Sequence, residues 1–155
     1  MPKPLHRGQA ERRRSCYFRA MTKPAPIRIA AAILTRRDTT MLVVRKRGTH
    51  AFMQPGGKIE PGEEPAVALC RELAEELGLT VTPDELFHVG RFDAPAANEP
   101  GHVVDAEVFS LRTDASIEPR AEIDEAVWID PASPADLHYA PLTRDHLIRL
   151  VAKPA

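Results

Sequence analysis

The sequence has few cysteines and no long run of apolar residues. Its two cysteines, Cys16 and Cys70, give neither a disulfide framework nor the ligand spacing of a zinc site, which favours a reducing, cytoplasmic setting. The longest apolar stretch, residues 27–34, is interrupted by Arg28 and is far shorter than the ~18 residues of a membrane-spanning helix. At 155 residues the chain has the length of one compact domain. We therefore expect a soluble domain that does not partner with a membrane.

A strong net charge of one sign is also absent, because the formal net charge is -1 at pH 7. Residues 1–20, however, carry six Lys and Arg side chains against one acidic side chain, a net charge of +5, so the remainder carries -6. An acidic body lacks the clustered Lys and Arg that bind the phosphates of nucleic acids. We expect no nucleic-acid partner, and we expect divalent cations to mediate any contact with phosphate groups.

Residues 1–20 show no apolar periodicity, and we predict a disordered basic tail there, followed by one domain over residues 21–155. An export signal is disfavoured because no apolar segment follows the arginines, and a solvated appendage is favoured over an arm that binds nucleic acid. We also expect Met21 to be the natural start, with the tail an upstream misreading. An intact mass that includes residues 1–20, measured on protein from its native source, would contradict this.

The rest of the chain alternates between apolar segments and turn residues. Strands are predicted at residues 27–34, 41–47, 52–54, 86–92, 102–111 and 126–129, and helices at 64–77 and 143–152. The first helix should end at Gly78, which suits a left-handed C-cap, and the second should begin behind Thr143 as its cap. Strands outnumber helices, with one helix in the middle and one at the end, which is typical of a mixed α/β sandwich.

The middle helix has two chemically different faces. Its apolar positions share one face and are Ala66, Leu69, Cys70, Leu73 and Leu77. Glu72, Glu75 and Glu76 share another face, which we expect to be exposed. Like charges three and four residues apart repel by a few tenths of a kcal/mol, so a positive partner is expected between them. Mg²⁺, which prefers oxygen ligands, is one such partner, and surface bases such as Arg71 are the alternative.

The residues around these glutamates follow a longer pattern. Gly57 is followed after five residues by Glu63, and after seven more by the run Arg71-Glu72-Leu73-Ala74-Glu75-Glu76-Leu77-Gly78-Leu79. This pattern matches the Nudix box at every fixed position, and the resemblance extends over roughly residues 27–151. The chain therefore resembles a small, MutT-like Nudix hydrolase. That resemblance implies an α/β/α sandwich with a mixed β-sheet and the loop-helix-loop of the family.

The resemblance also implies a metal site. The side chains that would bind Mg²⁺, or Mn²⁺ in its place, are Glu72, Glu75 and Glu76. The carbonyl oxygen of Gly56 would assist them. Arg71 would form an ion pair with Glu63 that holds the glutamates and the loop in place, so Arg71 is a candidate catalytic residue beside Glu75 and Glu76.

Further candidates lie outside the box. Family members often add an acid from a loop before the tryptophan-bearing strand, a position held here by Glu122, six residues before Trp128, with Glu125 as the nearby substitute. One of these, or Glu75, is the candidate general base. Lys58 and Arg47 are similar in placement to phosphate contacts of the family, although either could equally be an exposed base.

The expected reaction is attack by water on a phosphorus, with a nucleoside monophosphate as product and a (d)NTP as the favoured substrate. An ADP-ribose or nucleotide-sugar pyrophosphatase is the alternative, because Pro95 stands sixteen residues past the box, the spacing that marks that branch. Oxidised guanine is disfavoured, because Thr143 replaces the amide expected before the last helix and Asn98 lies in another loop. A non-catalytic nucleotide-binding regulator is disfavoured because every acid of the box is intact. Monomer and homodimer both stay open.

Overall fold

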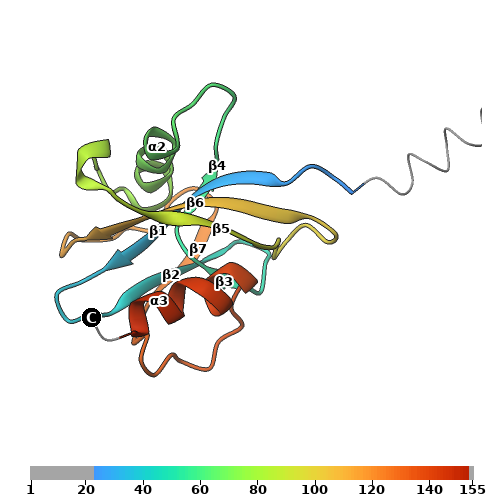
Figure 1. Cartoon of the computed structure of the whole chain (residues 1–155). Coiled ribbons are helices and arrows are strands. Elements are labelled where there is room, and N and C mark those ends of the chain that lie inside the picture. Colours follow the sequence, from blue (N-terminus) through green and yellow to red (C-terminus); the bar gives the residue numbers. More distant parts are fainter. Residues whose placement is uncertain (1–22, 154–155) are drawn as a thin grey trace, which may run out of the picture.

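The structure is a computed structural model that describes residues 23–153 (Figure 1). The strands are β1 (Ile27–Thr35), β2 (Met41–Lys46), β3 (Phe52–Met53), β4 (Gly56–Lys58), β5 (Phe87–Pro95), β6 (Val103–Arg112) and β7 (Ile123–Ile129). The helices are α2 (Pro65–Leu77), the short 3₁₀ turn η1 (Pro83–Glu85), the π-helical turn η2 (Thr143–Leu147) and α3 (Ile148–Ala152). Every predicted strand and helix is present, with ends shifted by a few residues. The predicted tail and the expected start at Met21 lie outside the described residues.

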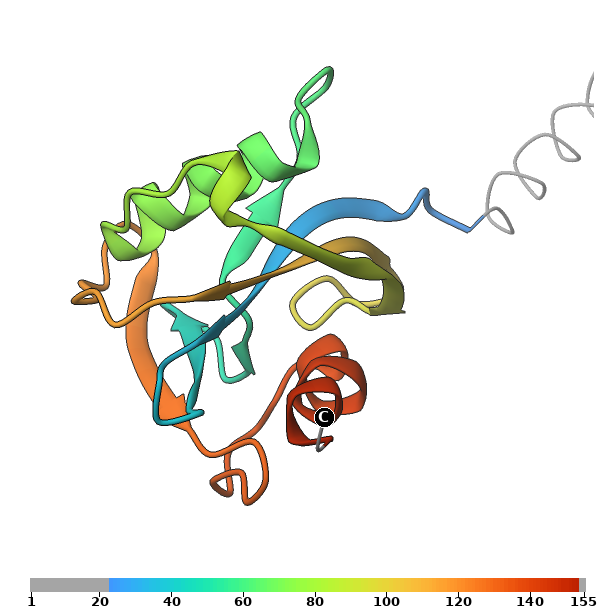
Figure 2. The ribbon, with the colours of Figure 1, turned by 60° about the vertical axis from the view of Figure 1, so that its left-hand side comes forward.

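Strands β1 and β2 form the centre of the sheet and are apolar on both faces. Ala30, Ala32 and Leu34 of β1 contribute to one core cluster, whereas Ala31 and Ile33 contribute to the other. Successive side chains of a strand point to opposite faces, so each face of β1 needs its own cover. Helix α2 covers the first face and the C-terminal helical segment covers the second (Figures 1 and 2). This arrangement confirms the α/β/α sandwich.

The sheet is mixed. Its strand order is β3-β2-β1-β6-β5, with β4 paired to β1 and β7 paired to β2. Strands β1 and β6 run parallel, and the other pairs are antiparallel. Because β4 and β7 both pair near the centre of this sheet, they bring the glycine turn before α2 and the loop before β7 to the same end of α2.

Helix α2 begins and ends where the sequence predicted. Pro65 occupies the first turn, where its missing N–H costs little, and the Ala68 amide donates to the Glu64 carbonyl oxygen at 2.9 Å. Gly78 ends the helix in the left-handed conformation, with φ of 62°, and its amide donates to Ala74. The amide of Leu79 donates back to Leu73, so the end of α2 is fixed by two backbone hydrogen bonds.

The C-terminal helical segment differs from its prediction at its first residue. Thr143 makes no helix cap, because residues 141 and 142 are already helical and Leu142 has right-handed helical dihedral angles. The Thr143 side chain is fully buried, and its hydroxyl donates to Gln54 Oε1 at 2.7 Å. The expected cap is therefore wrong, since this hydroxyl is used in a tertiary contact. None of the helices over residues 23–153 is long and apolar enough to cross a membrane.

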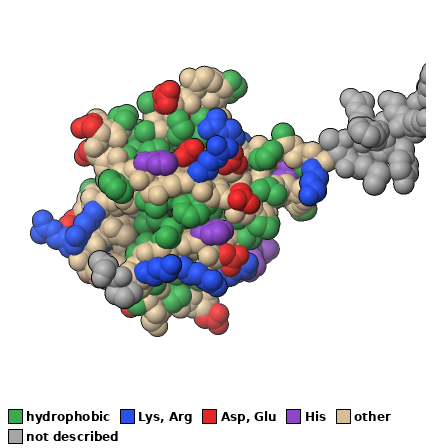
Figure 3. Space-filling view, in the orientation of Figure 1, with side chains coloured by type: hydrophobic (Ala, Val, Ile, Leu, Met, Phe, Trp, Pro, Cys, Tyr) green, Lys and Arg blue, Asp and Glu red, His purple; other side chains and the backbone are tan. Residues whose placement is uncertain are grey.

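The surface carries charges of both signs. Figure 3 shows Lys and Arg interspersed with Asp and Glu on the face seen in Figure 1, with apolar side chains between them. Some of these charges pair locally, as in the contact between Arg91 Nε and Asp105 Oδ1 at 2.7 Å and that between Arg37 Nε and Asp114 Oδ2 at 3.1 Å. Such exposed pairs each stabilise the fold by about 1 kcal/mol at most.

Candidate active site

Two glycines bring the backbone of β4 close to β1 and α2. Gly56 has φ of 137°, and a Cβ placed on it would lie 2.1 Å from the carbonyl oxygen of Ala30. A Cβ on Gly57 would lie 2.4 Å from the carboxyl carbon of Glu72. Only residues without a side chain fit here, so the glycine pair allows the loop to lie directly against the carboxylates of the helix.

Glu76 is buried beneath this loop. Its residue is 2% exposed, and the Gly56 amide donates to its Oε2 at 3.2 Å. Burial raises the pKa of Glu76 to about 8, and the hydrogen bond from Gly56 opposes this rise. Its Oε1 is buried without a hydrogen-bond partner among residues 23–153. The expectation that all three glutamates share an exposed face is therefore wrong for Glu76, because the glycine turn covers the side of α2 from which it projects.

Glu72 and Glu75 are more accessible, and Arg71 contacts both. Arg71 Nη1 lies 3.0 Å from Glu72 Oε1 and 3.7 Å from Glu75 Oε2. The Glu72 side chain is 15% exposed and that of Glu75 is 55% exposed. The three carboxylates therefore range from buried, at Glu76, to largely accessible to solvent, at Glu75. Burial raises the pKa of Glu72, although the neighbouring Arg71 lowers it.

The predicted ion pair between Arg71 and Glu63 is present. Arg71 Nε and Nη2 donate to the two oxygens of Glu63 at 3.0 and 2.9 Å. These hydrogen bonds hold the pKa of Glu63 down at about 2. Arg71 Nη2 also donates to the carbonyl oxygen of Lys58 at 3.2 Å. One guanidinium thus ties the loop before α2 to the first turns of the helix.

The donors at this site fit a hard divalent cation. Over residues 23–153 no three His, Cys, Asp or Glu side chains already converge as a metal-binding group. Glu76 Oε1, however, is a buried carboxylate oxygen that lacks a partner, and Glu72 adjoins the same glycine turn. An anionic oxygen without a partner is costly to bury, and oxygen is the ligand that Mg²⁺ and Mn²⁺ prefer. A cation at Glu76, Glu72 and the Gly56 backbone would remove that cost.

The loop before β7 faces this cluster, as predicted for Glu122. The amides of Arg120 and Glu118 donate to the carbonyl oxygens of Glu76 and Leu77 at 2.8 and 3.0 Å, which fixes the loop to the end of α2. Glu122 follows directly, and its charge raises the pKa of Glu76. The substitute candidate Glu125 instead pairs with Arg45, 3.2 Å from Arg45 Nη2 to Glu125 Oε2. The loop therefore brings Glu122 toward the glutamates and leaves Glu125 with Arg45.

Lys46 is the basic residue that the sequence analysis missed. Its Nζ lies 3.0 Å from Glu122 Oε1, and its charge lowers the pKa of both Glu72 and Glu76. Arg47, the residue favoured from the sequence, is exposed and does not line the adjacent pocket, whereas Lys46 does. Alternation along β2 could have identified it, because Leu42 and Val44 contribute to the core cluster beneath α2 and Lys46 continues the same alternation.

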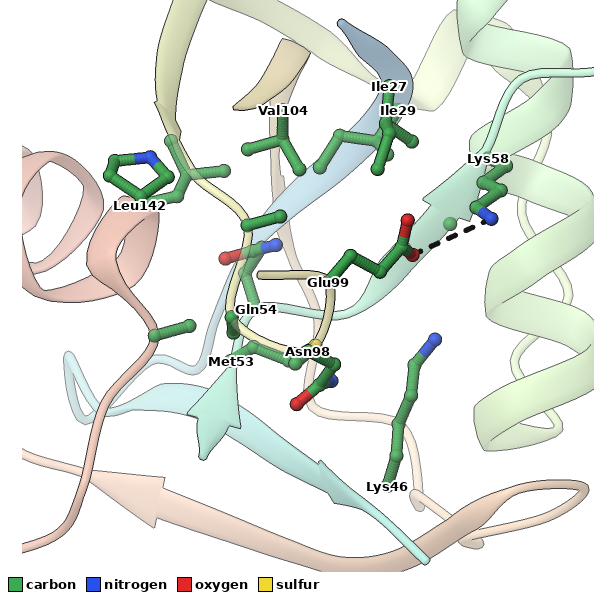
Figure 4. A pocket seen from close by; sticks show the side chains of 16 residues that line it. Ile27, Ile29, Lys46, Met53, Gln54, Lys58, Asn98, Glu99, Val104 and Leu142 are labelled. Atoms are coloured by element: carbon green, nitrogen blue, oxygen red, sulfur yellow. Dashed lines mark ion pairs between the residues drawn. The ribbon is translucent and has the colours of Figure 1, made fainter. Parts of the chain in front are cut away.

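A pocket opens beside the acidic cluster, between β1, β4 and the loop after β5. Figure 4 shows its apolar wall, made by Ile27, Ile29, Val104 and Leu142. Lys46 and Lys58 stand at the side that faces α2, and Lys58 Nζ lies 3.6 Å from Glu99 Oε1 of the loop. The predicted phosphate contact Lys58 is thus at the pocket, with a 68% exposed side chain. The arrangement joins an apolar pocket, two lysines and a carboxylate cluster in one continuous surface.

Comparison with known proteins agrees with this geometry. The family described as "NUDIX domain" matches residues 25–151. The chain belongs to the Nudix family. Helix α2 and the loop before it are therefore the Nudix helix and loop of this domain.

Individual relatives are matched over shorter segments. The domain is 36% identical over 74 residues to an 8-oxo-dGTP diphosphatase of Escherichia coli (strain K12), which covers 44% of this chain and 57% of that protein. It is 30% identical over 102 residues to a MutT-like protein of Streptomyces ambofaciens, covering 65% of this chain and 62% of that protein. The chain thus spans about three-fifths of the length of these relatives.

A solved structure supports the fold over a longer range. The MutT protein from Methanosarcina mazei Go1 superposes with a TM-score of 0.69 at 19% identity, over 84% of this chain and 95% of that chain. At this identity the likeness concerns the fold alone.

Proposed function

We propose that this Nudix domain hydrolyses the diphosphate linkage of a nucleotide in the presence of a divalent cation. The favoured substrate is a nucleoside triphosphate, cleaved to a nucleoside monophosphate and pyrophosphate. The observation that carries the proposal is the buried Glu76, whose Oε1 has no partner among the described residues and lies next to a glycine turn and a second carboxylate, Glu72. Oxygen donors without a structural partner are expected where a cation binds together with a phosphorylated ligand.

In this proposal the residues of the site have three roles: binding the cation, positioning its ligands and accepting a proton. Glu72, Glu75, Glu76 and the Gly56 backbone would hold Mg²⁺ or Mn²⁺, which supplies screening of phosphate charge and acidification of water when bound. Arg71 positions Glu72 through the 3.0 Å contact and anchors the loop through Glu63. Glu122 is our candidate for the group that takes the proton from the attacking water, because its loop is hydrogen-bonded to the end of α2.

Lys46 and Lys58 are the residues that would contact the phosphates of the nucleotide. Lys46 lies between Glu122 and the apolar pocket, and Lys58 lies at the edge of that pocket. A nucleotide whose base occupies the apolar pocket would extend its phosphates past both lysines toward the carboxylates. Lys46 thereby takes the role that the sequence analysis assigned to Arg47, and Lys58 keeps its own.

A nucleoside diphosphate linked to a sugar is the second candidate. Pro95, at the spacing that marks the ADP-ribose branch of the family, ends β5 and lines the same pocket. The two candidates differ in the products, since a nucleotide sugar gives a sugar phosphate in place of pyrophosphate.

A panel of nucleotides tests the proposal. Nucleoside triphosphates, ADP-ribose and a UDP-sugar are incubated with Mg²⁺, with Mn²⁺ or with a chelator, and the products are identified by chromatography. We expect nucleoside monophosphate and pyrophosphate from a triphosphate, with turnover lost in the chelator. Binding of nucleotides without turnover of any of them would favour the non-catalytic regulator and contradict the proposal.

A further inference from the structure

The pocket contains a buried amide that the proposed chemistry does not use. Gln54 follows β3 and lines the pocket, yet the residue is 7% exposed. Its backbone amide donates to Thr143 Oγ1 at 3.1 Å, and its side-chain Oε1 accepts the Thr143 hydroxyl at 2.7 Å. Within residues 23–153 the side-chain Nε2 group has no hydrogen-bond partner. Among the described residues the only buried side-chain polar atom without a partner is Glu76 Oε1, so the Gln54 nitrogen is accessible from the pocket and free to donate to a ligand.

Thr143 determines which end of the amide faces the pocket. Its oxygen already accepts the Gln54 backbone N–H, so its own hydroxyl proton is available to donate, and Gln54 Oε1 takes it. A flipped amide would leave that buried proton without this acceptor. The planar amide group then turns its nitrogen away from Thr143. Figure 4 shows the nitrogen of Gln54 on the side of the other lining residues and its oxygen on the side of the C-terminal segment.

The rest of the lining makes this donor stand out. The wall consists largely of aliphatic side chains, among them Ile29, Val104 and Leu142, and includes no aromatic side chain over the described residues. The charged residues at the rim already have partners, Lys46 with Glu122 and Lys58 with Glu99. A ligand base in this pocket would meet apolar surface and two side-chain amides, the exposed Asn98 on the loop after β5 and the buried Gln54, whose N–H donors lie at the inner edge.

We propose that Gln54 selects the ligand, its side-chain N–H donating to a carbonyl oxygen of the bound nucleobase, and that Thr143 holds the amide in that orientation. The inference rests on the proposed function in taking the ligand to be a nucleotide, and it deepens that function by naming the class of base. A base with a carbonyl oxygen at that edge accepts a hydrogen bond from the Gln54 side-chain N–H. A base with an exocyclic amine there places its own N–H against the N–H of Gln54, and no hydrogen bond forms between them. Gln54 is thus a specificity residue, and Thr143 a positioning residue that acts through it.

Two nucleotide pairs isolate this contact. ITP has a carbonyl oxygen where ATP has an exocyclic amine, and UTP has one where CTP has an amine; in both pairs the adjacent ring nitrogen changes from an acceptor to an N–H. We expect kcat/KM to favour the carbonyl member by about tenfold or more, the order of magnitude of one buried hydrogen bond, in whichever pair is turned over faster. In Gln54→Leu, which keeps the volume and removes the donors, this ratio should fall toward one, mainly through KM.

Thr143 provides the matched variants. Thr143→Ser keeps the hydroxyl and should keep the ratio, whereas Thr143→Val removes the hydroxyl and should lower it. A residue needed only for folding would change stability without changing the ratio between two substrates. Thermal unfolding identifies a variant that does not fold, in which case the Ser and Val pair, or Gln54→Met, supplies the comparison.

The outcomes separate this inference from the proposed function. A ratio near one in the parent protein, or a parental ratio in Gln54→Leu, overturns the role of Gln54 while hydrolysis stands. If none of the four nucleotides is hydrolysed, the panel described above, which includes nucleotide sugars, decides the proposed function, and the same ratios are measured as dissociation constants by calorimetry. Tighter binding of ITP or UTP would still support Gln54, whereas equal binding or no binding would overturn it.

Discussion

At the scale of single residues, the site is defined by how differently its three glutamates are buried. Glu76 is 2% exposed, whereas the Glu75 side chain is 55% exposed one position earlier on the same helix. A buried carboxylate with an oxygen that has no partner is costly in the absence of a cation. If Glu76 holds the cation as proposed, it is the residue at which cation binding and the stability of the fold would be coupled most directly.

Replacement of Glu76 tests that coupling. In Glu76→Gln the amide fits the same volume, but a ligand charge is lost, so kcat/KM should fall about 100-fold or more while the protein stays folded. Steady-state kinetics in Mg²⁺ and thermal unfolding measure the two effects. The control is Glu64→Gln, the same chemical change at the exposed N-cap of α2, where the side chain makes no cap hydrogen bond. Parental activity in Glu76→Gln would show the assignment to be wrong.

Acid stability should depend on Glu63. Arg71 lowers the folded pKa of Glu63 from 4.5 to about 2, so this carboxylate contributes stability that is present above pH 4.5 and lost as the pH falls through about 2. In Glu63→Gln the free energy of unfolding should lose the part of its decrease between pH 4.5 and about pH 2 that comes from this carboxylate. Urea unfolding between pH 5 and pH 2 measures this free energy. A variant whose free energy of unfolding depends on pH as in the parent protein would contradict the ion pair.

At the scale of elements, the glycine turn and α2 form one unit. The backbone of Gly56 is hydrogen-bonded to Glu76, Gly57 lies against Glu72, and Arg71 returns to Glu63 and the Lys58 carbonyl oxygen. The loop before β7 is also fixed to this unit, through hydrogen bonds to the last turn of α2. Residues from three separate segments therefore depend on the exact approach of β4 to β1.

Two glycine replacements with opposite surroundings test this approach. Gly56→Ala should destabilise the fold by about 3 kcal/mol or more, because its Cβ would collide with the Ala30 carbonyl oxygen and its φ is positive. Gly62→Ala shares a positive φ, 75°, but its Cβ would meet nothing within 4 Å, so its cost should stay near 1 to 2 kcal/mol. Denaturant unfolding compares them, and equal costs would mean that close approach is unimportant.

The elements also show where local sequence signals stop. Gly78 was predicted as the end of α2 because left-handed geometry favours glycine, and it has φ of 62°. Strand β4 lies beyond the strand predicted at residues 52–54, and no local pattern predicts it, because its pairing with β1 is a tertiary contact. The cap predicted at Thr143 is wrong for a similar reason: its hydroxyl donates to Gln54, which lies 89 residues away in the sequence, and local signals do not report such a contact.

At the scale of the whole molecule, cation binding should appear as stability. An ion that binds only the folded state stabilises that state by about 2.7 kcal/mol when the ion concentration is 100 times the dissociation constant. Mg²⁺ or Mn²⁺ should therefore raise the Tm of the parent protein by several degrees. Glu76→Gln should show little of this increase, and Glu64→Gln should show all of it. A scanning calorimetry experiment in which neither ion shifts the parental Tm would contradict the metal site.

The sequence by itself determined the features that depend on neighbouring residues. The ends of α2 and the spacing of its glutamates follow from turn residues and periodicity within one element. The ion pair between Arg71 and Glu63 is implied by the resemblance to the Nudix box, and it is present. Tertiary structure decided the rest. Alternation along β2 puts Lys46 on the face beneath α2, but only the pairing of β2 with β7 brings its Nζ to Glu122. The burial of Glu76 and the orientation of Gln54 by Thr143 depend on which distant segments meet, and the energy of such contacts leaves no local pattern in the chain.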